Sequence, residues 1–518
     1  MKIIIDRNGK RTKTDYSWQF GMGNDHAAQH LRTDMCEHIK LAHDELGIKY
    51  VRFHGIFDDD MLICQSLYDN RYMRGLPGAK NIGQFNFHQV GVVLDNVLNT
   101  GLKPFVELSF MPSALAKGKK IGFKYFHYEN NVSLPKSFEK WQEFIRAFIG
   151  YITERYGKDE VESWYFEVWN EPDLGGFFAG SQKDYFRLYK ATVEAVKSVN
   201  NNLRVGGPST SACLWVDDFV NYCVQNNVKY DFVSTHHYPG DAFGNSFGIG
   251  KALGMMSTTK KAGKENWPLG KTYEALFFRP DEFKDWESGI FASMDEKAKA
   301  QAGEKPLFIT EWNSMATFGS PVHDEKYSAA FVARAAIDLD HRCEGYMFWC
   351  ISDLFEEQML INEHFHGSFG IISNRGIPKP NFWAFKMLSM LYPERILTEK
   401  AEGDLQHALY TDDKNLQVLI TAQNHDYYKN EKHTVELEID FEPKEALAYR
   451  IDDEHCNPKK LWQDMGAKEN LTKAEVERIK DETRLKAEKQ SFTYKDGKCR
   501  ILVELSTNDV ILLDLKGE

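Results

Sequence analysis

Short apolar runs recur along the first 390 residues, separated by longer amphipathic stretches. Each run is almost continuously apolar or β-branched, as expected for parallel strands that are buried on both faces. Eight such runs predict strands, namely WQFGMG (18–23), KYVRFHG (49–55), KPFVELSF (103–110), WYFEVWN (164–170), LRVGGP (203–208), DFVSTHH (231–237), PLFITE (306–311) and GYMFWCI (345–351).

The stretches between these runs carry apolar stripes at helical spacing. Phe138, Trp141, Ile145 and Phe148 follow one another at intervals of three or four residues, and a second stripe begins at Tyr185. A strand followed by a helix, repeated eight times, predicts an α/β fold with a closed (β/α)8 TIM barrel over residues 15–390. An open doubly wound sheet is the competing fold, but no GxGxxG motif follows any of these strands.

The pattern changes after residue 390. Shorter segments such as NLQVLITAQN, HTVELEID and RILVELS alternate with turn residues, which predicts an antiparallel β-sandwich over residues 391–518. A charged stretch at 461–490 interrupts it as one or two helices, and Thr472 with Glu475 forms a capping box there. KIIID, within residues 1–14, has no helix partner in the barrel, so we expect it to pair into this distal sheet.

Composition narrows the possible partners. The formal net charge of -12 disfavours nucleic acid, whose phosphates require a basic surface. Aromatic residues make up 13% of the chain, and aromatic rings pack well on the C–H faces of sugars. The eight cysteines form no CxxC motif and are expected to be reduced thiols. MKIIIDRNGKRTK is too polar for a signal peptide or a membrane span, so we expect a cytoplasmic protein without a membrane partner.

Polar residues cluster where the predicted barrel strands end, which is where such barrels place functional groups. Glu171 follows the fourth strand and Glu311 ends the seventh, so the two carboxyl groups would face each other across the barrel mouth. A single glutamate at a strand end is more often a solvated charge or an ion-pair partner. Two of them, each beside Trp and Asn, favour glycoside cleavage, which needs one carboxyl to protonate the leaving oxygen and one to capture the cationic carbon.

Neighbouring polar residues have candidate supporting roles. Asn170 either forms a turn before Pro172 or bonds the sugar 2-OH, and the second role is favoured. His236 and the residue after it point to opposite sides of their strand, so one is expected to line the site and the other to pack among the helices. Tyr238 either packs in the core or donates to the Glu311 carboxylate. The pair His364 and His366 could be read as a metal motif, but further ligands at recognisable spacing are missing, and loop packing or substrate contact is favoured.

The motifs are similar to those of a known family. WYFEVWNEPDL with FITEWNS downstream resembles the large clan of retaining barrel glycosidases. AHDELGIKYVRFHGIFDDDM, KPFVELSFMP, LRVGGPSTS, FVSTHHYP, SDLFEE and FHGSFGIISNRGIPKP resemble more closely the β-xylosidases of glycoside hydrolase family 39, over residues 16 to 390. The resemblance implies a retaining exo-glycosidase that releases terminal β-D-xylose from small oligosaccharides, without metal or cofactor, as a homo-oligomer such as a tetramer.

The same resemblance assigns site residues. Glu171 would be the acid/base and Glu311 the nucleophile. The residues implied to contact the glycone are His54, Asn170, His236, Tyr238 and Glu357. Trp312 and Phe348 would help to wall the pocket.

One segment departs from the family pattern. The segment 240–305, after the sixth strand, is longer than the corresponding xylosidase loop, and we expect it to overhang the mouth and shape the subsites. The glycone therefore has alternatives within the family, namely α-L-arabinopyranosidase, β-glucosidase, β-galactosidase and α-L-iduronidase-like activities. Two more remote classes are a metal-dependent barrel hydrolase and a non-catalytic sugar-binding protein.

Overall fold

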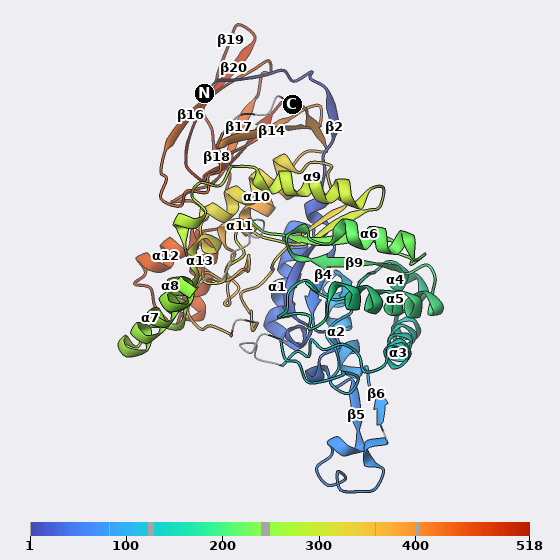
Figure 1. Cartoon of the computed structure of the whole chain (residues 1–518). Helices are drawn as coiled ribbons and strands as arrows, with labels where there is room; N and C mark the ends of the chain where they lie inside the picture. Colours follow the sequence, from blue (N-terminus) through green and yellow to red (C-terminus); the bar gives the residue numbers. More distant parts are fainter. Residues whose placement is uncertain are drawn as a thin grey trace.

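The computed structural model describes residues 2–81, 83–122, 129–239, 249–357, 359–398, 401 and 403–517. A barrel surrounded by helices forms the main body, and a pair of β-sheets lies at one end of it (Figure 1). A narrow hairpin projects from the opposite end of the molecule. No helix among the described residues is long and apolar enough to cross a membrane.

The eight predicted strands form a closed parallel barrel in the order β10-β11-β12-β3-β4-β7-β8-β9. All eight sequence predictions for these strands are therefore confirmed. Their bounds are β3 Gly21–His26, β4 Tyr50–His54, β7 Lys103–Glu107, β8 Tyr165–Glu167, β9 Arg204–Thr210, β10 Phe232–His237, β11 Leu307–Trp312 and β12 Gly345–Phe348.

Large side chains fill the barrel interior below the strand ends. Phe105 on β7 and Phe308 on β11 belong to opposite walls, yet their ring centroids are 6.1 Å apart. Phe232 and Met347 complete this buried cluster. The interior is thus a packed core, as in other barrels of this type, and only the carboxyl ends of the strands are open for chemistry.

Helices surround the barrel and bury their apolar stripes against it. The stripe that begins at Phe138 lies on α3, where Trp141, Phe144 and Phe148 are fully buried. The helices between and after the barrel strands are α1 Thr33–Leu46, α2 His88–Asn99, α3 Phe138–Tyr156, α4 Lys158–Glu162, α5 Gln182–Val199, α6 Val216–Gln225, α7 Ile249–Glu265, α8 Leu269–Phe277, α9 Ile290–Ala302, α10 Lys326–Asp338 and α11 Pro380–Ser389.

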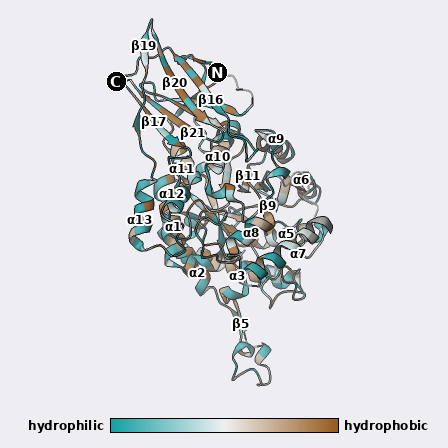
Figure 2. Ribbon diagram, turned by 90° about the vertical axis from the view of Figure 1, so that its left-hand side faces the viewer, coloured by the Kyte–Doolittle hydropathy of each residue, from teal (hydrophilic) through white to brown (hydrophobic). Residues whose placement is uncertain are grey.

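The distal part consists of two sheets with the orders β18-β17-β21-β15-β14-β13-β2 and β1-β16-β20-β19. Their facing apolar residues form a core of their own, and the alternation of apolar and polar positions along these strands is visible in Figure 2. The strands are β1 Lys2–Ile5, β2 Arg11–Lys13, β13 Glu394–Ile396, β14 Leu405–Thr411, β15 Leu416–Ala422, β16 Lys432–Ile439, β17 Glu445–Ile451, β18 Glu488–Lys489, β19 Thr493–Lys495, β20 Lys498–Ser506 and β21 Val510–Lys516.

Segments from both ends of the sequence meet in these sheets. β1 pairs with β16 in parallel, as expected for KIIID, and β2 pairs with β13. The charged interruption contains two helices, α12 Pro458–Asp464 and α13 Lys473–Glu482. The predicted capping box of Thr472 and Glu475 is present at the start of α13.

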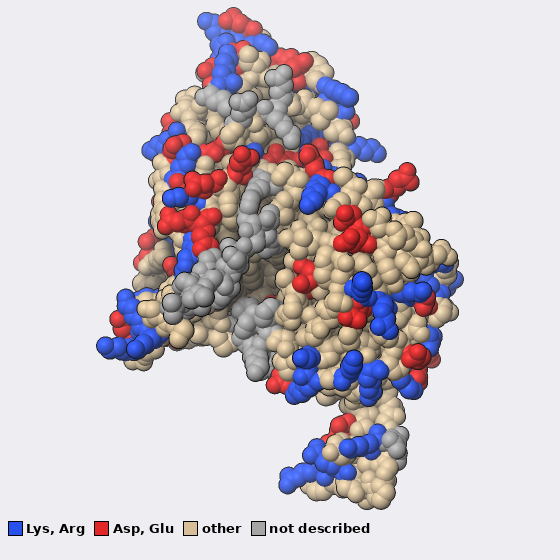
Figure 3. All heavy atoms as spheres, viewed as in Figure 1, with Lys and Arg blue, Asp and Glu red and all other residues tan. Residues whose placement is uncertain are grey.

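Two excursions leave the regular barrel pattern. One is the segment after β10, which contains α7 and α8 before the barrel helix α9. The other is a hairpin of β5 Cys64–Ser66 and β6 Gly83–Phe85, which we call the arm (residues 64–85). Figures 1 and 2 show the arm projecting away from the body in two perpendicular views. Figure 3 shows both Lys and Arg and acidic side chains on the arm, and both signs of charge are interspersed over the body on that face.

Candidate active site

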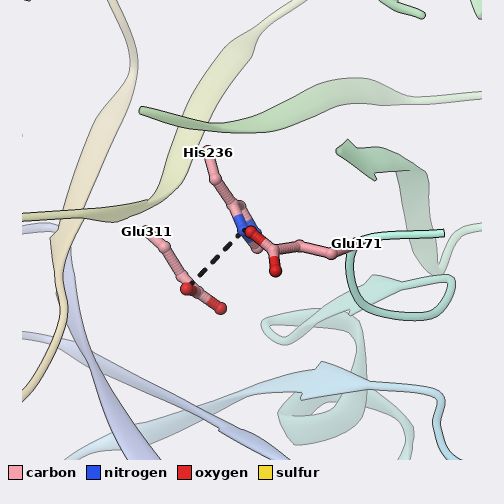
Figure 4. A group of neighbouring side chains, drawn as sticks. All are labelled: Glu171, His236 and Glu311. Atoms are coloured by element: carbon pink, nitrogen blue, oxygen red, sulfur yellow. Dashed lines mark hydrogen bonds and ion pairs between the residues drawn. The ribbon is translucent and has the colours of Figure 1, made fainter. Parts of the chain in front are cut away.

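Glu171 and Glu311 converge at the carboxyl end of the barrel, with His236 beside them (Figure 4). The three come from the loop after β8, from β11 and from β10. One oxygen of each carboxylate and one ring nitrogen of His236 all lie within 4.8 Å of one another. Retaining glycosidases hold their two carboxyl groups about 5–5.5 Å apart, whereas inverting ones leave room for a water between them. The arrangement therefore fits direct attack by one carboxylate.

The turn that carries Glu171 has an unusual backbone. Trp169 and Glu171 have φ values of 74° and 39°, in the left-handed region that side chains other than glycine rarely adopt. The indole N–H of Trp169 donates to the carbonyl of Phe177 over 2.8 Å, and the Glu171 backbone N–H donates to the Ser209 carbonyl over 2.8 Å. These bonds hold the strained turn, which is typical of functional sites, and they fix where the carboxyl group points.

The environment of Glu171 favours its protonated form. Burial raises the pKa of this carboxyl well above its usual range, and the nearby negative charges of Glu311 and Asp173 raise it further. His236 Nδ1 lies 2.9 Å from a Glu171 oxygen. The other ring nitrogen, Nε2, faces the Arg52 guanidinium at 3.4 Å. Because guanidinium can only donate, Nε2 is the acceptor and Nδ1 carries the proton that points at Glu171.

Glu311 has the opposite environment. Arg52 Nη1 lies 2.7 Å from one of its oxygens, and the Tyr238 hydroxyl donates to the other over 2.8 Å. Burial opposes ionisation, but His236, Arg52, His54 and the Tyr238 hydrogen bond together lower the pKa of this carboxyl below its usual value. The expected Tyr238 bond is thus present, and the two carboxyl groups have pKa values that are shifted in opposite directions.

Arg52 lies at the centre of the site and was not assigned a role from the sequence. Its fully buried guanidinium bonds Glu167 at 2.6 Å and Glu311 at 2.7 Å, and its Nη2 lies 2.9 Å from Glu107. It also donates to Asn170 Oδ1 over 2.9 Å. A useful signal was available, because an arginine inside an apolar strand, two residues before His54, must face the same side and needs buried carboxylates as partners.

His54 occupies the same face of β4. Its Nδ1 lies 2.8 Å from Glu107, and its Nε2 lies 3.7 Å from Glu311 and 4.0 Å from Glu357. Burial disfavours protonation, but the charges of Glu107 and Glu311 outweigh it and raise the pKa of His54 to about 9. For Glu357 burial dominates and raises the pKa to about 8. At neutral pH the site therefore presents an imidazolium beside a carboxylic acid.

Two buried polar atoms point to a ligand. Asn170 Nδ2 and Glu357 Oε2 are buried and lack a hydrogen-bond partner within the described part of the chain. Buried polar groups are nearly always paired, so unpaired ones in a site are the groups that a bound hydroxyl would satisfy. Both residues were expected to contact the glycone, and the structure brings them to the same site as His54.

Trp312 and Phe348 do not lie in the site, which corrects the expectation that they wall it. Glu311 points into the barrel, so Trp312, the next residue on the strand, points outward. Phe348 pairs with it in register, and both rings pack on Phe385 of α11. The aromatic wall is instead Trp349, whose ring centroid lies 4.6 Å from that of His54.

His237 follows the predicted alternation. Its ring stacks on Phe291 of α9 with centroids 4.0 Å apart, among the helices, while His236 faces the site. His366 Nδ1 lies 2.7 Å from the Glu363 carbonyl, and the ring of His364 packs near Trp462 at 6.0 Å. Neither belongs to a cluster of metal-ligating side chains among the described residues. These contacts are of the loop-packing kind, which was one of the two favoured interpretations; substrate contact, the other, stays a prediction.

The segment after β10 reaches the site on one side. Tyr273 of α8 packs edge-on against Phe318 with centroids 5.1 Å apart, in the same buried cluster as Tyr238 and Trp349. The backbone N–H of Gly270 donates to Glu363 over 2.9 Å. The part of this segment at 240–248 lies outside the described residues. The α8 part supports the aromatic residues that border the two carboxyl groups.

The group of Glu171, His236 and Glu311 also has the composition of a metal site. Its hydrogen bonds argue against that use, because His236 Nδ1 carries a proton and Nε2 accepts from Arg52. In a second group, Asp404 with Glu431 and His433, Lys429 already takes the place of a cation, because its ammonium lies 2.9 Å from Asp404 and 3.3 Å from Glu431.

Comparison with known proteins agrees with this geometry. The family model described as Glycosyl hydrolases family 39 matches residues 1–264 and 290–500. A β-xylosidase of Caldicellulosiruptor saccharolyticus is 35% identical over 95% of this chain and 93% of its own length. A β-xylosidase of Geobacillus stearothermophilus is 29% identical over 100% of this chain and 96% of its own.

A solved structure shares the fold. The monomeric β-xylosidase of Caulobacter crescentus CB15 superposes with a TM-score of 0.76 at 24% identity, covering 100% of this chain and 99% of the other. With a family match over most of the sequence and a paired-carboxylate site at the mouth of the barrel, this chain is a glycoside hydrolase and belongs to glycosyl hydrolase family 39.

Proposed function

We propose that the protein is a retaining exo-β-xylosidase that releases terminal β-D-xylose from xylo-oligosaccharides. The observation that carries the mechanism is the contrast between Glu171 and Glu311. Their oxygens lie within 4.8 Å, yet the pKa of Glu171 is raised and that of Glu311 is lowered. Two carboxyl groups with pKa values pushed apart are the usual arrangement for a general acid beside a nucleophile.

The reaction proceeds in two displacements. A Glu311 oxygen attacks the anomeric carbon while Glu171 gives its proton to the departing oxygen, so the glycosidic bond breaks and a glycosyl ester forms. Glu171, now ionised, takes a proton from water as that water attacks the same carbon. The ester bond breaks, Glu311 leaves as the carboxylate, and the product keeps the anomeric configuration of the substrate.

The charges around the pair support each step. Arg52 and Tyr238 hold Glu311 ionised before attack and receive it again as the leaving group in the second step. Once Glu311 is esterified, its negative charge no longer raises the pKa of Glu171. The pKa of Glu171 therefore falls, and its carboxylate can remain ionised and act as the general base.

Glycone recognition is proposed for the remaining groups of the site. Asn170 Nδ2 donates to the 2-OH, where hydrogen bonding strengthens as the cationic transition state forms. His54 and Glu357 bond further ring hydroxyls, and Trp349 forms an apolar wall beside His54. His236 holds the Glu171 carboxyl in position through its Nδ1 proton.

The relatives named β-xylosidases support xylose as the glycone. An iduronide is disfavoured because its carboxylate would need a cation. Both cations of the site already have carboxylate partners, Arg52 in Glu107, Glu167 and Glu311, and His54 in Glu107. The remaining family alternatives, α-L-arabinopyranoside, β-glucoside and β-galactoside, share the mechanism and differ only in the pocket around the sugar.

Initial rates on a panel of 4-nitrophenyl glycosides test this proposal, with Glu311→Ala as the blank. The panel holds β-D-xyloside, α-L-arabinopyranoside, β-D-glucoside, β-D-galactoside and an α-L-iduronide. The xyloside should be preferred, and its turnover should vanish in Glu311→Ala. Azide should then restore a glycosyl azide of inverted configuration in that variant. Full activity of Glu311→Ala would refute the residue assignment, and preference for another sugar would refute the substrate assignment alone.

We also propose a homo-oligomer, such as a tetramer, in a reducing, cytoplasmic environment. All eight cysteines are unpaired, as in proteins of reducing compartments. The arm exposes Tyr72 and Leu76, which are 86% and 53% accessible, away from the body. The C. crescentus relative is monomeric, so the oligomeric state of this chain has to be measured. Light scattering on the intact chain and on a Tyr72→Ser, Leu76→Ser variant tests the assembly. A monomer for the unmodified chain would contradict it.

A further inference from the structure

A second cavity, remote from the two catalytic glutamates, lies where three parts of the chain meet. It has a volume of about 460 Å³ and is bordered by the start of α10, the loop before β16 and the helix α12. Cavities of this size at the junction of domains are common places for small-ligand binding. None of the residues that form the proposed catalytic site borders it.

Tyrosines form the apolar part of this cavity. Tyr427 is fixed from behind by Phe278, with ring centroids 5.0 Å apart and planes at 80°. Tyr428 lies beside it at 5.4 Å, and 69% of its surface is accessible. The rings of Tyr427 and Tyr428 are at 78° to each other. Tyr428 thus offers an aromatic face to solvent next to a cavity.

Charged groups form the polar part, and they are compensated in pairs. Lys326 lies 2.9 Å from Asp453 and 2.8 Å from Asp509, and Lys459 lies 2.5 Å from Glu325. The other two lysines of the cavity are paired in the same way, Lys429 with Asp404 and Lys460 with Asp464. Each ammonium has three donors, so these pairs still offer hydrogen bonds without a net field of one sign.

We propose that this cavity is a second, non-catalytic carbohydrate site that binds a neutral β-linked polysaccharide chain. A pyranose ring would pack its C–H face on Tyr428. Its hydroxyl groups would bond the lysine–carboxylate pairs and the side chain of Gln463, which borders the cavity. An anionic ligand would have to displace carboxylates that already hold the lysines, whereas a neutral, hydroxyl-rich one adds to the existing pairs. The site would hold the enzyme on the polymer that supplies its shorter substrates.

Native gel electrophoresis with soluble β-1,4-xylan or β-1,4-glucan in the gel tests this site without relying on turnover. The Glu311→Gln background keeps the polymer intact. Tyr428→Ala and Gln463→Ala remove the proposed contacts, and Tyr494→Ala removes another exposed tyrosine, on β19, as the matched control. Tyr427 is left in place because it packs on Phe278.

At least one polymer should retard the parent protein and the Tyr494→Ala control. Tyr428→Ala should weaken the apparent affinity by roughly threefold to tenfold, as expected for the loss of one ring contact. The rate on 4-nitrophenyl β-D-xyloside, measured with Tyr428→Ala in the active enzyme, should stay unchanged. Equal retardation of Tyr428→Ala and the parent, or no retardation of the parent, overturns the proposal. Retardation that disappears in about 0.5 M NaCl also overturns it, because that result indicates an ionic site.

Discussion

The guanidinium of Arg52 on β4 donates to the carboxylate of Glu311 on β11 over 2.7 Å, across the barrel interior and almost without access to solvent. The same guanidinium also contacts Glu107 and Glu167, so three buried carboxylates share one buried cation. Such a network is strongly destabilised when one member is removed, because the charges left behind remain buried. Arg52 therefore links the stability of the barrel to the charge state of Glu311, the proposed nucleophile.

Arg52→Lys should keep a positive charge but lose most of these bonds, because an ammonium cannot match the planar guanidinium. We expect kcat/KM to fall and the pKa of Glu311 to rise. The acidic limb of the pH profile reports the carboxyl that must be ionised, so this limb should move to higher pH. Arg52→Met should unfold at lower temperature, with a loss of about 3–5 kcal/mol. An acidic limb that stays in place in Arg52→Lys would contradict the role given to Arg52.

Glu171→Gln should lose the proton donor while keeping the nucleophile. Hydrolysis of a 4-nitrophenyl xyloside should slow strongly, whereas formation of the glycosyl-enzyme from a 2,4-dinitrophenyl xyloside should persist, because that leaving group needs no proton. The basic limb of the pH profile should disappear, since it reports the raised pKa of Glu171. Stopped-flow measurement of the dinitrophenolate burst checks that the glycosyl-enzyme still forms. A basic limb that is unchanged in Glu171→Gln would show that another residue is the general acid.

Tyr238→Phe should remove one hydrogen bond to the ionised form of Glu311. A bond to a charged group contributes about 1.5–3 kcal/mol, which corresponds to a fall in kcat/KM of roughly 10- to 100-fold. The acidic limb should again move to higher pH, by less than in Arg52→Lys. Tyr494→Phe is the matched control on the distal sheet. Equal pH profiles for Tyr238→Phe and the parent enzyme would show that the hydroxyl does not act on Glu311.

His54 should make folding stability depend on pH. Its pKa is raised to about 9 in the folded protein from an ordinary value of 6.5. A raised pKa means that the folded state holds the proton more tightly. Its contribution is complete below about pH 6.5 and is lost as pH rises to about 9. The difference in unfolding free energy between the parent and His54→Asn should therefore shrink over that window, by an amount on the order of 3 kcal/mol. Urea melts at several pH values measure it, and a constant difference would contradict the protonated state.

Trp349→Ala should raise KM for xylosides, because it removes the wall beside His54. Trp312→Phe should lower the melting temperature with little change in KM, because Trp312 packs on α11 outside the barrel. Measuring both quantities on both variants separates a wall residue from a packing residue. A raised KM in Trp312→Phe, with no change of KM in Trp349→Ala, would support the original prediction that Trp312 walls the pocket.

The fold, and the position of Glu171 and Glu311 at the mouth of the barrel, could be predicted because each rests on a local pattern. Buried parallel strands are continuous apolar runs, and the functional edge of a barrel follows from where those runs end. Arg52 was not assigned a role although its place inside an apolar strand was a signal, because its carboxylate partners Glu107, Glu167 and Glu311 lie far apart in the sequence, on three other strands. The prediction that Trp312 walls the pocket was wrong, although side chains alternate along a strand and Glu311 points into the barrel, which already places Trp312 on the outside. The arm was missed because its strands, at three residues each, are too short to show a period.

The strand β1 precedes the barrel in the sequence, while its partner β16 follows it. During synthesis on the ribosome, β1 must therefore wait until the whole barrel and much of the distal part have been made before it can pair. A sheet whose strands are separated in the sequence by a whole domain forms late, because contacts between distant parts of a chain form slowly. The order of assembly should thus be barrel first and distal sheets last, with the exposed edge of β16 open to aggregation until β1 arrives.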